Sequence, residues 1–270
     1  MTDLIRAVLL GVIEGLTEFL PVSSTGHMIL ALPLLEVDAG LPRWRVFLFV
    51  SQLGAILAVV AYFWRDLWRR TLHWPGGLQT HVFTKLAAAM IPTVLLGLLG
   101  NDFMETYFEN ARTGPPATAI GLIVGAAAIV YIDRRFRRAG EQTLDDVSLR
   151  QAFWIGVIQC ISMWPGVSRA GASIMGGMAL GLTPQVATQF SFYLAIPTML
   201  AAGALRLWKY RADLTADAAG VILAGTLAAF VTALLVVAAF LNYVRSRSFA
   251  PFAVYRVALG AGVLAWYWLG

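Results

Sequence analysis

Long apolar segments recur along this chain of 270 residues, and they constrain its fold more than any other feature. Each is close to the roughly 20 residues that a helix needs to cross a bilayer. Only 13% of the residues are charged and the mean hydropathy is +0.73, whereas soluble proteins are about 25% charged. We therefore predict an all-α polytopic membrane protein. Its expected crossings are at about 46–64, 86–100, 117–132, 190–205, 218–241 and 252–269.

Two polar islands interrupt this apolar sequence. The first, 14–27, reads Glu-Gly-Leu-Thr-Glu-Phe-Leu-Pro-Val-Ser-Ser-Thr-Gly-His, and the second, 165–173, reads Pro-Gly-Val-Ser-Arg-Ala-Gly-Ala-Ser. Ionisable groups at membrane depth are costly and usually face a cavity with a function. Two carboxylates, an arginine, a histidine and several serines indicate chemistry on a phosphate. The carboxylates also break the N-terminal apolar run, so no secretory signal is expected.

An internal repeat organises the chain. A shift of 145 residues aligns the first island with the second, and a shift of 143 aligns the crossings that follow. The first shift places Ala7, Gly11, Val12, Ile13, Val22, Ser23 and Gly26 on Ala152, Gly156, Val157, Ile158, Val167, Ser168 and Gly171. Duplicated halves that meet at a central site are a recurring plan in membrane proteins. Chance similarity among abundant small residues is the alternative.

Each half opens with an apolar run that Pro and Gly break, followed by a second short run: 4–20 is followed by 27–36, and 150–164 by 172–182. We predict two repeats, 1–135 and 150–270, with re-entrant helix pairs at about 4–36 and 150–182. Irregular backbone at membrane depth has to be buried in protein or line a wet cavity. Each half then has three crossings, an odd number, so the two repeats would be inverted. Two complete crossings in place of each re-entrant pair remain the alternative.

The distribution of basic residues predicts the orientation. The loops around 65–85, 133–150 and 242–252 are richer in basic residues than the loops on the opposite side. The positive-inside rule makes these loops cytoplasmic, so both termini and the mouth of the first re-entrant pair are expected to be extracytoplasmic. Because the basic residues lie in short loops, the net charge of +5 does not indicate nucleic acid.

Glu14 and Glu18 are four residues apart, so on a helix they lie on one face. Two ionised carboxylates there repel each other unless a cation or a shared proton intervenes. A divalent cation with oxygen ligands fits when the substrate also brings phosphate oxygens, so both residues are candidate metal ligands. The alternative is a pair that only hydrogen-bonds its polar neighbours.

Ser23, Ser24 and Thr25 follow Pro21, where the helix has to break. These hydroxyls could cap the next helix, and helix N-termini also bind phosphate, so both roles are compatible. A serine can act as a nucleophile if a base is near, and His27 could supply or relay a proton to Ser24. A structural histidine is the alternative.

Arg169 is the residue of the second island that indicates phosphate binding most specifically. A guanidinium within the membrane needs an anion, and its planar fork suits bidentate contact with phosphate. Pairing only with Glu14 or Glu18 is the alternative. Gly166 and Gly171 would let backbone amides approach the ligand closely.

With these motifs the chain resembles the undecaprenyl-diphosphate phosphatase family, also known as the bacitracin-resistance phosphatases. The two islands are similar to the family's two signatures, and 52–54, 190–192 and 251–256 extend the resemblance almost end to end. The second signature departs from the family's usual Ser-Arg-Ser-Gly-Ala-Thr, because Ala170 replaces a serine and Ser173 a threonine. Ser173 can still donate a hydrogen bond.

The resemblance implies an enzyme that hydrolyses undecaprenyl diphosphate to undecaprenyl phosphate and phosphate. That reaction recycles the lipid carrier of peptidoglycan synthesis and confers bacitracin resistance. The resemblance also implies a divalent cation, Mg or Ca, and a homodimer in the bacterial inner membrane. The expected catalytic residues are Glu14, Glu18, Ser24, His27 and Arg169. The expected substrate-binding residues are Ser23, Thr25, Gly26, Gln52, Gly166, Ser168, Gly171 and Ser173.

Two rival functions remain open at this point. One is another class of lipid phosphatase with a histidine nucleophile, which Ser168-Arg169 partly matches although no second histidine follows. The other is a transporter or flippase of an anionic isoprenoid lipid, which inverted repeats alone would equally suit.

Overall fold

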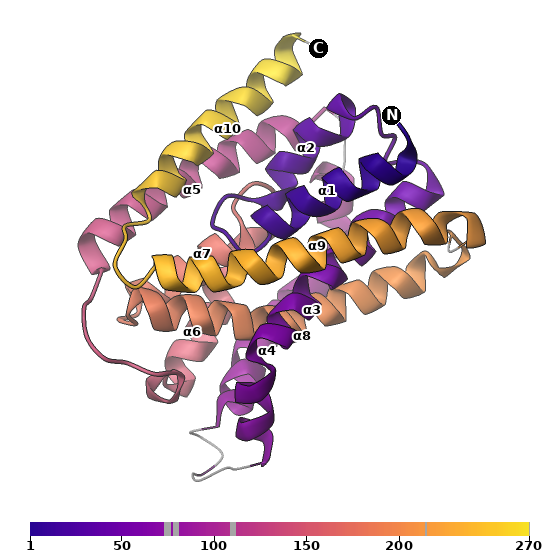
Figure 1. Cartoon of the computed structure of the whole chain (residues 1–270). Helices are drawn as coiled ribbons and strands as arrows, with labels where there is room; N and C mark the ends of the chain where they lie inside the picture. Colours follow the sequence, from indigo (N-terminus) through magenta and orange to yellow (C-terminus); the bar gives the residue numbers. More distant parts are fainter. Residues whose placement is uncertain (73–76, 78–80, 109–111, 214, 270) are drawn as a thin grey trace.

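The computed structural model describes residues 1–72, 77, 81–108, 112–213 and 215–269, and the regular structure within these ranges is entirely helical (Figure 1). Residues 73–76 and 78–80, within one of the predicted basic loops, lie outside the described residues. The helices are α1 Asp3–Thr17, α2 Ser24–Leu34, α3 Pro42–Leu72, α4 Val82–Phe108, α5 Gly114–Phe136, α6 Leu149–Gln159, α7 Arg169–Ala179, α8 Pro184–Lys209, α9 Ala216–Tyr243 and α10 Ala250–Leu269. Short 3-10 turns at Leu144–Asp146, Cys160–Met163 and Arg211–Asp213 complete the described elements.

Six of these helices are long and apolar enough to cross a membrane: α3, α4, α5, α8, α9 and α10. Each contains one of the apolar segments recognised in the sequence, because a run of about 20 apolar residues has no other stable form in lipid. Their outer faces expose large aliphatic side chains, among them Val254, Leu235 and Leu98. Such a surface suits acyl chains rather than water. The prediction of an all-α, multi-pass membrane protein is confirmed.

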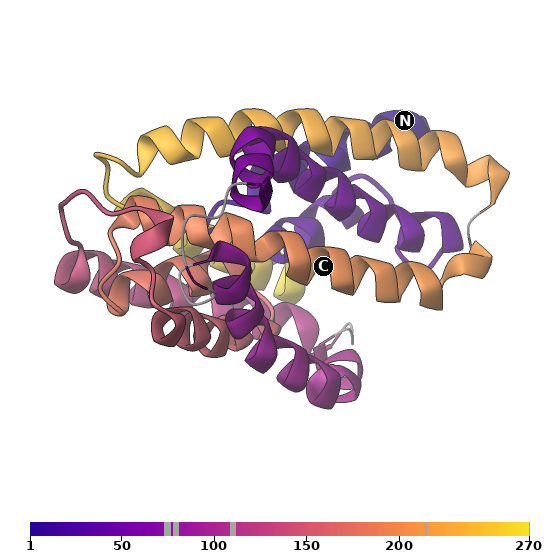
Figure 2. The same ribbon diagram turned by 90° about the horizontal axis from the view of Figure 1, so that it is seen from below.

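The helices form a bundle in which α9 packs along both α1 and α3, while α5 packs along α10 (Figures 1 and 2). Small residues allow this close approach. A Cβ added at Gly11 of α1 would lie 2.1 Å from the carbonyl oxygen of Gly225 in α9. A Cβ added at Gly156 of α6 would lie 2.0 Å from the carbonyl oxygen of Ala89 in α4. Backbone contact of this kind is typical of helix pairs in membranes.

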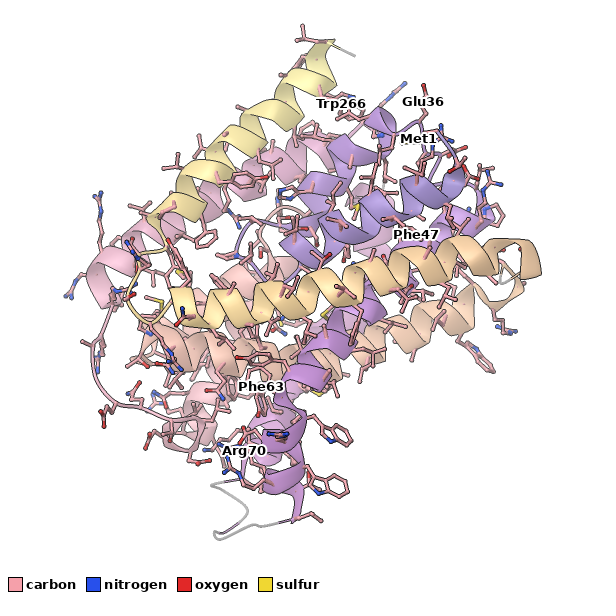
Figure 3. All side chains as sticks on the ribbon, viewed as in Figure 1. Met1, Glu36, Phe47, Phe63, Arg70 and Trp266 are labelled. Atoms are coloured by element: carbon pink, nitrogen blue, oxygen red, sulfur yellow. The ribbon has the colours of Figure 1, made fainter. Side chains whose placement is uncertain are left out.

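Ion pairs fasten two opposite ends of the molecule. Near the N-terminus, Arg6 bridges Asp3 and Glu36. Arg70, near the end of α3, pairs with Asp145, and Figure 3 shows it far from Met1 and Glu36. These pairs connect neighbouring segments near the two ends of the bundle. Charged groups cost less there than in its apolar middle.

The short helices begin earlier than the apolar runs suggested. The sequence placed the second short runs at 27–36 and 172–182, whereas α2 and α7 begin at Ser24 and Arg169. The reason is the cap: the hydroxyls of Ser23 and Ser168 accept hydrogen bonds from the amides of the residues three positions on. The motif residues therefore belong to the first turns of these helices.

Candidate active site

The two polar islands meet in the interior of the bundle. The loop after α1 and the loop before α7 are in contact, since the Ser168 hydroxyl donates to the carbonyl of Leu20 at 3.4 Å. Ser168 also caps α7 by accepting from the amide of Gly171 at 3.1 Å, while Ser23 caps α2 by accepting from Gly26 at 3.4 Å. The chain thus brings together two segments that are more than a hundred residues apart in sequence.

Ser23 and Ser168 also share an unusual backbone. Their φ angles are +69° and +71°, in the left-handed region that favours glycine. A non-glycine residue held there costs of order 1–3 kcal/mol and persists only where its surroundings require it. The two serines are equivalent under the 145-residue shift, so both halves accept the same strain at the same turn.

Glu18 connects the two islands. One carboxylate oxygen accepts a hydrogen bond from the Ser24 hydroxyl at 2.7 Å, and the other accepts from Nη2 of Arg169 at 3.4 Å. The side chains of Glu18 and Arg169 are only 10% and 14% exposed, so this contact is largely screened from solvent. Three of the predicted site residues therefore form one connected group.

Arg169 is held loosely for a buried guanidinium. Nη1 donates to the carbonyl of Ser191 at 3.3 Å, and the group lies 5.6 Å from the ring centre of Phe19. Its Nε is buried without a hydrogen-bond partner. Two long contacts and one unpaired donor leave capacity for an anion, because a guanidinium can donate five hydrogen bonds.

Ser173 supports Arg169 from the next turn of α7. Its hydroxyl donates to the carbonyl of Arg169 at 2.8 Å and lies 2.6 Å from the hydroxyl of Ser191. Ser173 is thus a neighbour of the arginine's backbone. Its side chain is almost fully buried.

Glu14 lies one turn before Glu18 and is 2% exposed. Its carboxyl group contacts the side chains of Glu18 and Gln52, which brings the predicted Gln52 of α3 into the site. One oxygen, Oε1, has no hydrogen-bond partner. A buried, unpaired carboxylate oxygen next to a second carboxylate is costly unless a proton or a cation is shared.

The His27 ring is hydrogen-bonded to Ser23 and Tyr255. Nδ1 lies 2.7 Å from the carbonyl oxygen of Ser23, and Nε2 lies 2.6 Å from the hydroxyl of Tyr255. A carbonyl can only accept, so Nδ1 carries a proton, and in the neutral ring Nε2 accepts from Tyr255. Both ring nitrogens are therefore engaged by groups other than Ser24 and Glu18.

The remaining predicted residues differ in their surroundings. Thr25 is exposed, and Gly26 is buried. Gly166 has a φ of +86°, and a Cβ there would lie 2.1 Å from the carbonyl oxygen of Thr118, so close packing already requires glycine. Within the described residues, no group of three or more His, Cys, Asp or Glu side chains is placed to hold a metal ion. A metal ion at the predicted ligands Glu14 and Glu18 would therefore have two carboxylates from the described part of the chain.

Known proteins are similar to this chain over nearly its whole length. The family model described as bacitracin resistance protein BacA matches residues 7–262. A protein of Novosphingobium aromaticivorans named undecaprenyl-diphosphatase is 43% identical over 272 residues, covering 98% of each chain. A protein of Nitrobacter hamburgensis with the same name is 41% identical over 266 residues, covering 98% of this chain and 97% of its own. The chain belongs to the BacA family.

This member of the BacA family contains a second buried arginine, which lies in the segment 251–256 of the family resemblance and for which the sequence predicted no role in the site. Arg256 of α10 is fully buried and donates to main-chain carbonyl oxygens at 2.8–3.1 Å. Its acceptors are Pro21, Gly121, Leu122, Gly166 and Val167. Arg256 thus holds both loops of the site against α5. An arginine within a predicted crossing was the available signal.

Tyr255, the residue before Arg256, is a further residue for which the sequence predicted no role in the site. Its ring lies 5.5 Å from that of His27, nearly parallel to it, and its hydroxyl contacts Nε2. The partnership joins residues 228 positions apart. Local sequence carries no sign of a pairing over that distance.

Proposed function

We propose that this chain hydrolyses the terminal phosphate of undecaprenyl diphosphate, releasing undecaprenyl phosphate and phosphate. The observation that carries the proposal is the buried group of Ser24, Glu18 and Arg169. It places a hydroxyl, a carboxylate and a partly unpaired guanidinium together among apolar helices. Relatives named undecaprenyl-diphosphatase that match over nearly their whole length support the same substrate. Recycling of the carrier would account for the bacitracin resistance in the family description.

The architecture we propose for this reaction is a pair of inverted repeats. Each half has two short helices followed by three long ones. At 1.5 Å per residue, the 15 residues of α1 extend about 22 Å and the 11 residues of α2 about 16 Å, less than a hydrocarbon core of about 30 Å. Short helices that meet at a capped turn are best explained as re-entrant pairs. The basic loops would be cytoplasmic, and both termini and the mouth of the first pair extracytoplasmic.

Arg169 is the proposed phosphate-binding residue. Its unpaired Nε and weakly engaged Nη groups can donate to two oxygens of one phosphate, as a guanidinium fork commonly does. The amides of Ser24 and Thr25, in the first turn of α2, are also free of the Ser23 cap, which takes the amide of Gly26. Amides at a helix N-terminus favour a bound anion.

A divalent cation, Mg or Ca, is proposed to bind at Glu14 and Glu18. The buried, unpaired Oε1 of Glu14 beside a second carboxylate suits such an ion. Two carboxylates and the Gln52 side chain do not complete a coordination shell, so phosphate oxygens of the substrate would supply further ligands. When bound, the ion would neutralise charge on the diphosphate.

For the chemical step we propose attack by the Ser24 hydroxyl on the terminal phosphorus. A bond forms between the serine oxygen and phosphorus, the bond from phosphorus to the bridging oxygen breaks, and the serine proton passes to Glu18. Water then hydrolyses the phosphoserine. Glu18 is favoured over His27 as the first proton acceptor because it is the residue that Ser24 contacts. Direct attack by a water molecule, with Ser24 only binding phosphate, is the competing route.

The experiment is phosphate release from undecaprenyl diphosphate by the purified protein and its Ser24→Ala variant. No release by the wild-type protein under any divalent cation would overturn the hydrolase and favour a lipid transporter. If Ser24 is the nucleophile, the variant loses nearly all turnover at saturating lipid. Substantial turnover with a raised KM would instead establish the water route. A phosphoserine at position 24 in a rapidly quenched reaction would establish covalent catalysis.

A further inference from the structure

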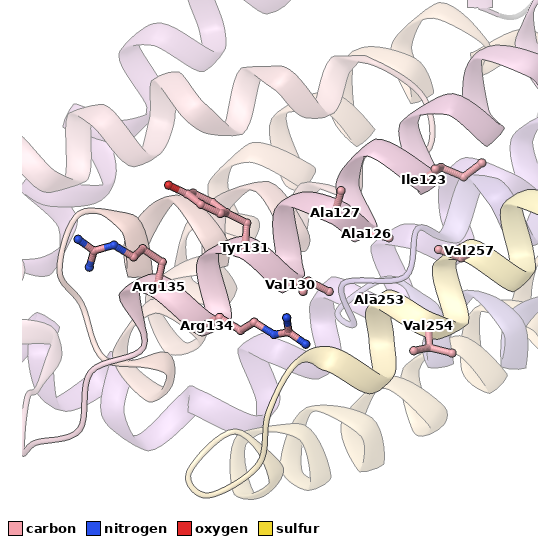
Figure 4. Close-up of a pocket in the computed structure, with 10 residues that line it drawn as sticks. All are labelled: Ile123, Ala126, Ala127, Val130, Tyr131, Arg134, Arg135, Ala253, Val254 and Val257. Carbon is pink, nitrogen blue, oxygen red and sulfur yellow. The ribbon is translucent and has the colours of Figure 1, made fainter.

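A groove runs along the outer face of the bundle between α5 and α10, and the residues that line it belong to neither polar island (Figure 4). It has a volume of about 700 Å³, within the roughly 300–1,000 Å³ of typical small-molecule sites. Most of its lining is aliphatic: Ile123, Ala127, Val130, Val254 and Val257. Among the lining residues, Ala126 and Ala253 are buried, whereas Val254 and Val257 are exposed.

The groove matches the length of one lipid chain within one leaflet. From Ile123 to Arg134 along α5 is eleven residue steps, or about 17 Å at 1.5 Å per residue. Half of a hydrocarbon core of about 30 Å is about 15 Å. An acyl chain can therefore occupy the groove over most of its length without leaving its own leaflet.

Two arginine side chains lie at one end of this groove. Arg134 and Arg135 both line it and both are exposed, and Figure 4 shows the Arg134 side chain directed toward the start of α10. Among the described residues, neither guanidinium is within ion-pair distance of a carboxylate, whereas the nearby Arg137 binds Asp133 at 2.8 Å. The Arg135 guanidinium lies 5.5 Å from the ring centre of Phe136, a contact that leaves its hydrogen-bond donors available to an external anion.

We propose that the groove is a site for an anionic phospholipid of the bilayer, with an acyl chain between α5 and α10 and the headgroup phosphate at Arg134 and Arg135. Basic pockets between transmembrane helices on the cytoplasmic side are where anionic headgroups bind, and the predicted orientation places these arginines on that side. A second copy of the chain is a less suitable occupant of the groove. A twofold axis normal to the membrane would place the same arginines of both copies at one depth, where their like charges repel.

The test is native mass spectrometry of the full chain, titrated with phosphatidylglycerol or with phosphatidylcholine of the same acyl chains. We expect one phosphatidylglycerol to be retained under conditions that remove phosphatidylcholine. Arg134→Gln with Arg135→Gln should weaken retention about 25-fold, because each basic residue near an anionic headgroup contributes roughly a factor of five. The matched control is Arg65→Gln with Arg150→Gln, which removes two exposed cations from the same predicted side but outside the groove.

A second pair of variants tests the apolar part. Ala127→Trp fills the groove and should abolish retention. Ala128→Trp, at an adjacent exposed alanine that does not line the groove, should leave it unchanged. Equal retention by the Arg134 and Arg135 variant, equal loss in the control, or full retention by Ala127→Trp would each overturn the site. So would conversion of a dimer to a monomer by Ala127→Trp without bound lipid in either form, because the groove would then be a subunit interface.

Discussion

Replacement of Arg256 by lysine tests whether this residue stabilises the loops of the site rather than taking part in the reaction. Arg256 satisfies carbonyl oxygens of five residues, and a lysine has only three donors. At least two of these buried carbonyls would lose their hydrogen bond to the side chain, at about 1–3 kcal/mol each, so the free energy of unfolding should fall by about 2–6 kcal/mol. For a chain of this size each kcal/mol shifts the Tm by about 2–4 °C, which predicts a decrease of roughly 4–24 °C.

The assay is thermal unfolding in a fixed detergent, followed by size-exclusion chromatography of the soluble fraction. Arg169→Lys is the matched control, because Arg169 makes only two long hydrogen bonds and its loss should reduce turnover more than stability. Arg256→Lys should shift the Tm strongly, whereas Arg169→Lys should remain near the wild-type value with most activity lost. A Tm for Arg256→Lys within about 2 °C of wild type would refute the argument from unsatisfied carbonyls.

Three further outcomes follow from the site. Glu14→Gln and Glu18→Gln should each reduce phosphate release severely and move the cation requirement of any residual activity to higher concentration; an unchanged titration would argue against a ligand role. Tyr255→Phe should lower turnover less than His27→Ala and add nothing to it in the double variant, because the hydroxyl acts through the imidazole; additive losses would show a separate role. Ser23→Ala and Ser23→Gly both lose the cap, but only Ser23→Ala keeps a side chain at a positive φ, so it should lower the Tm more; the reverse order would contradict the backbone strain at Ser23.

The crossings could be predicted from the sequence because lipid leaves a long apolar run only one stable form. Each of the six expected segments falls inside a long helix, for example 46–64 within α3. The closeness of the islands was also predictable, since Glu18, Ser24 and Arg169 are the kinds of residue that are rarely tolerated in lipid unless they meet. The structure joins these three as hydrogen-bonded neighbours.

The starts of α2 and α7 and the partners of His27 could not be predicted from local patterns. Ser23 and Ser168 adopt a backbone conformation that neither residue prefers in isolation, so only the surrounding contacts explain it. Tyr255 meets His27 from the last helix of the chain. The sequence shows that Arg256 places a charge in an apolar segment, which is costly. Its acceptors come from three separate segments, so they depend on how those segments pack.

The hydrogen bonds of Arg256 tie the loop after α1 to the loop before α7. Nη1 holds Pro21 of the first loop and Val167 of the second at 3.0 Å each, so neither loop can shift without breaking a bond of the same guanidinium. A site fixed in this way is already arranged before substrate arrives, which is how preorganised groups lower a barrier. If the proposed site is correct, any motion that admits a long lipid has to come from the surrounding helices, because the two loops proposed to hold the diphosphate are tied to each other.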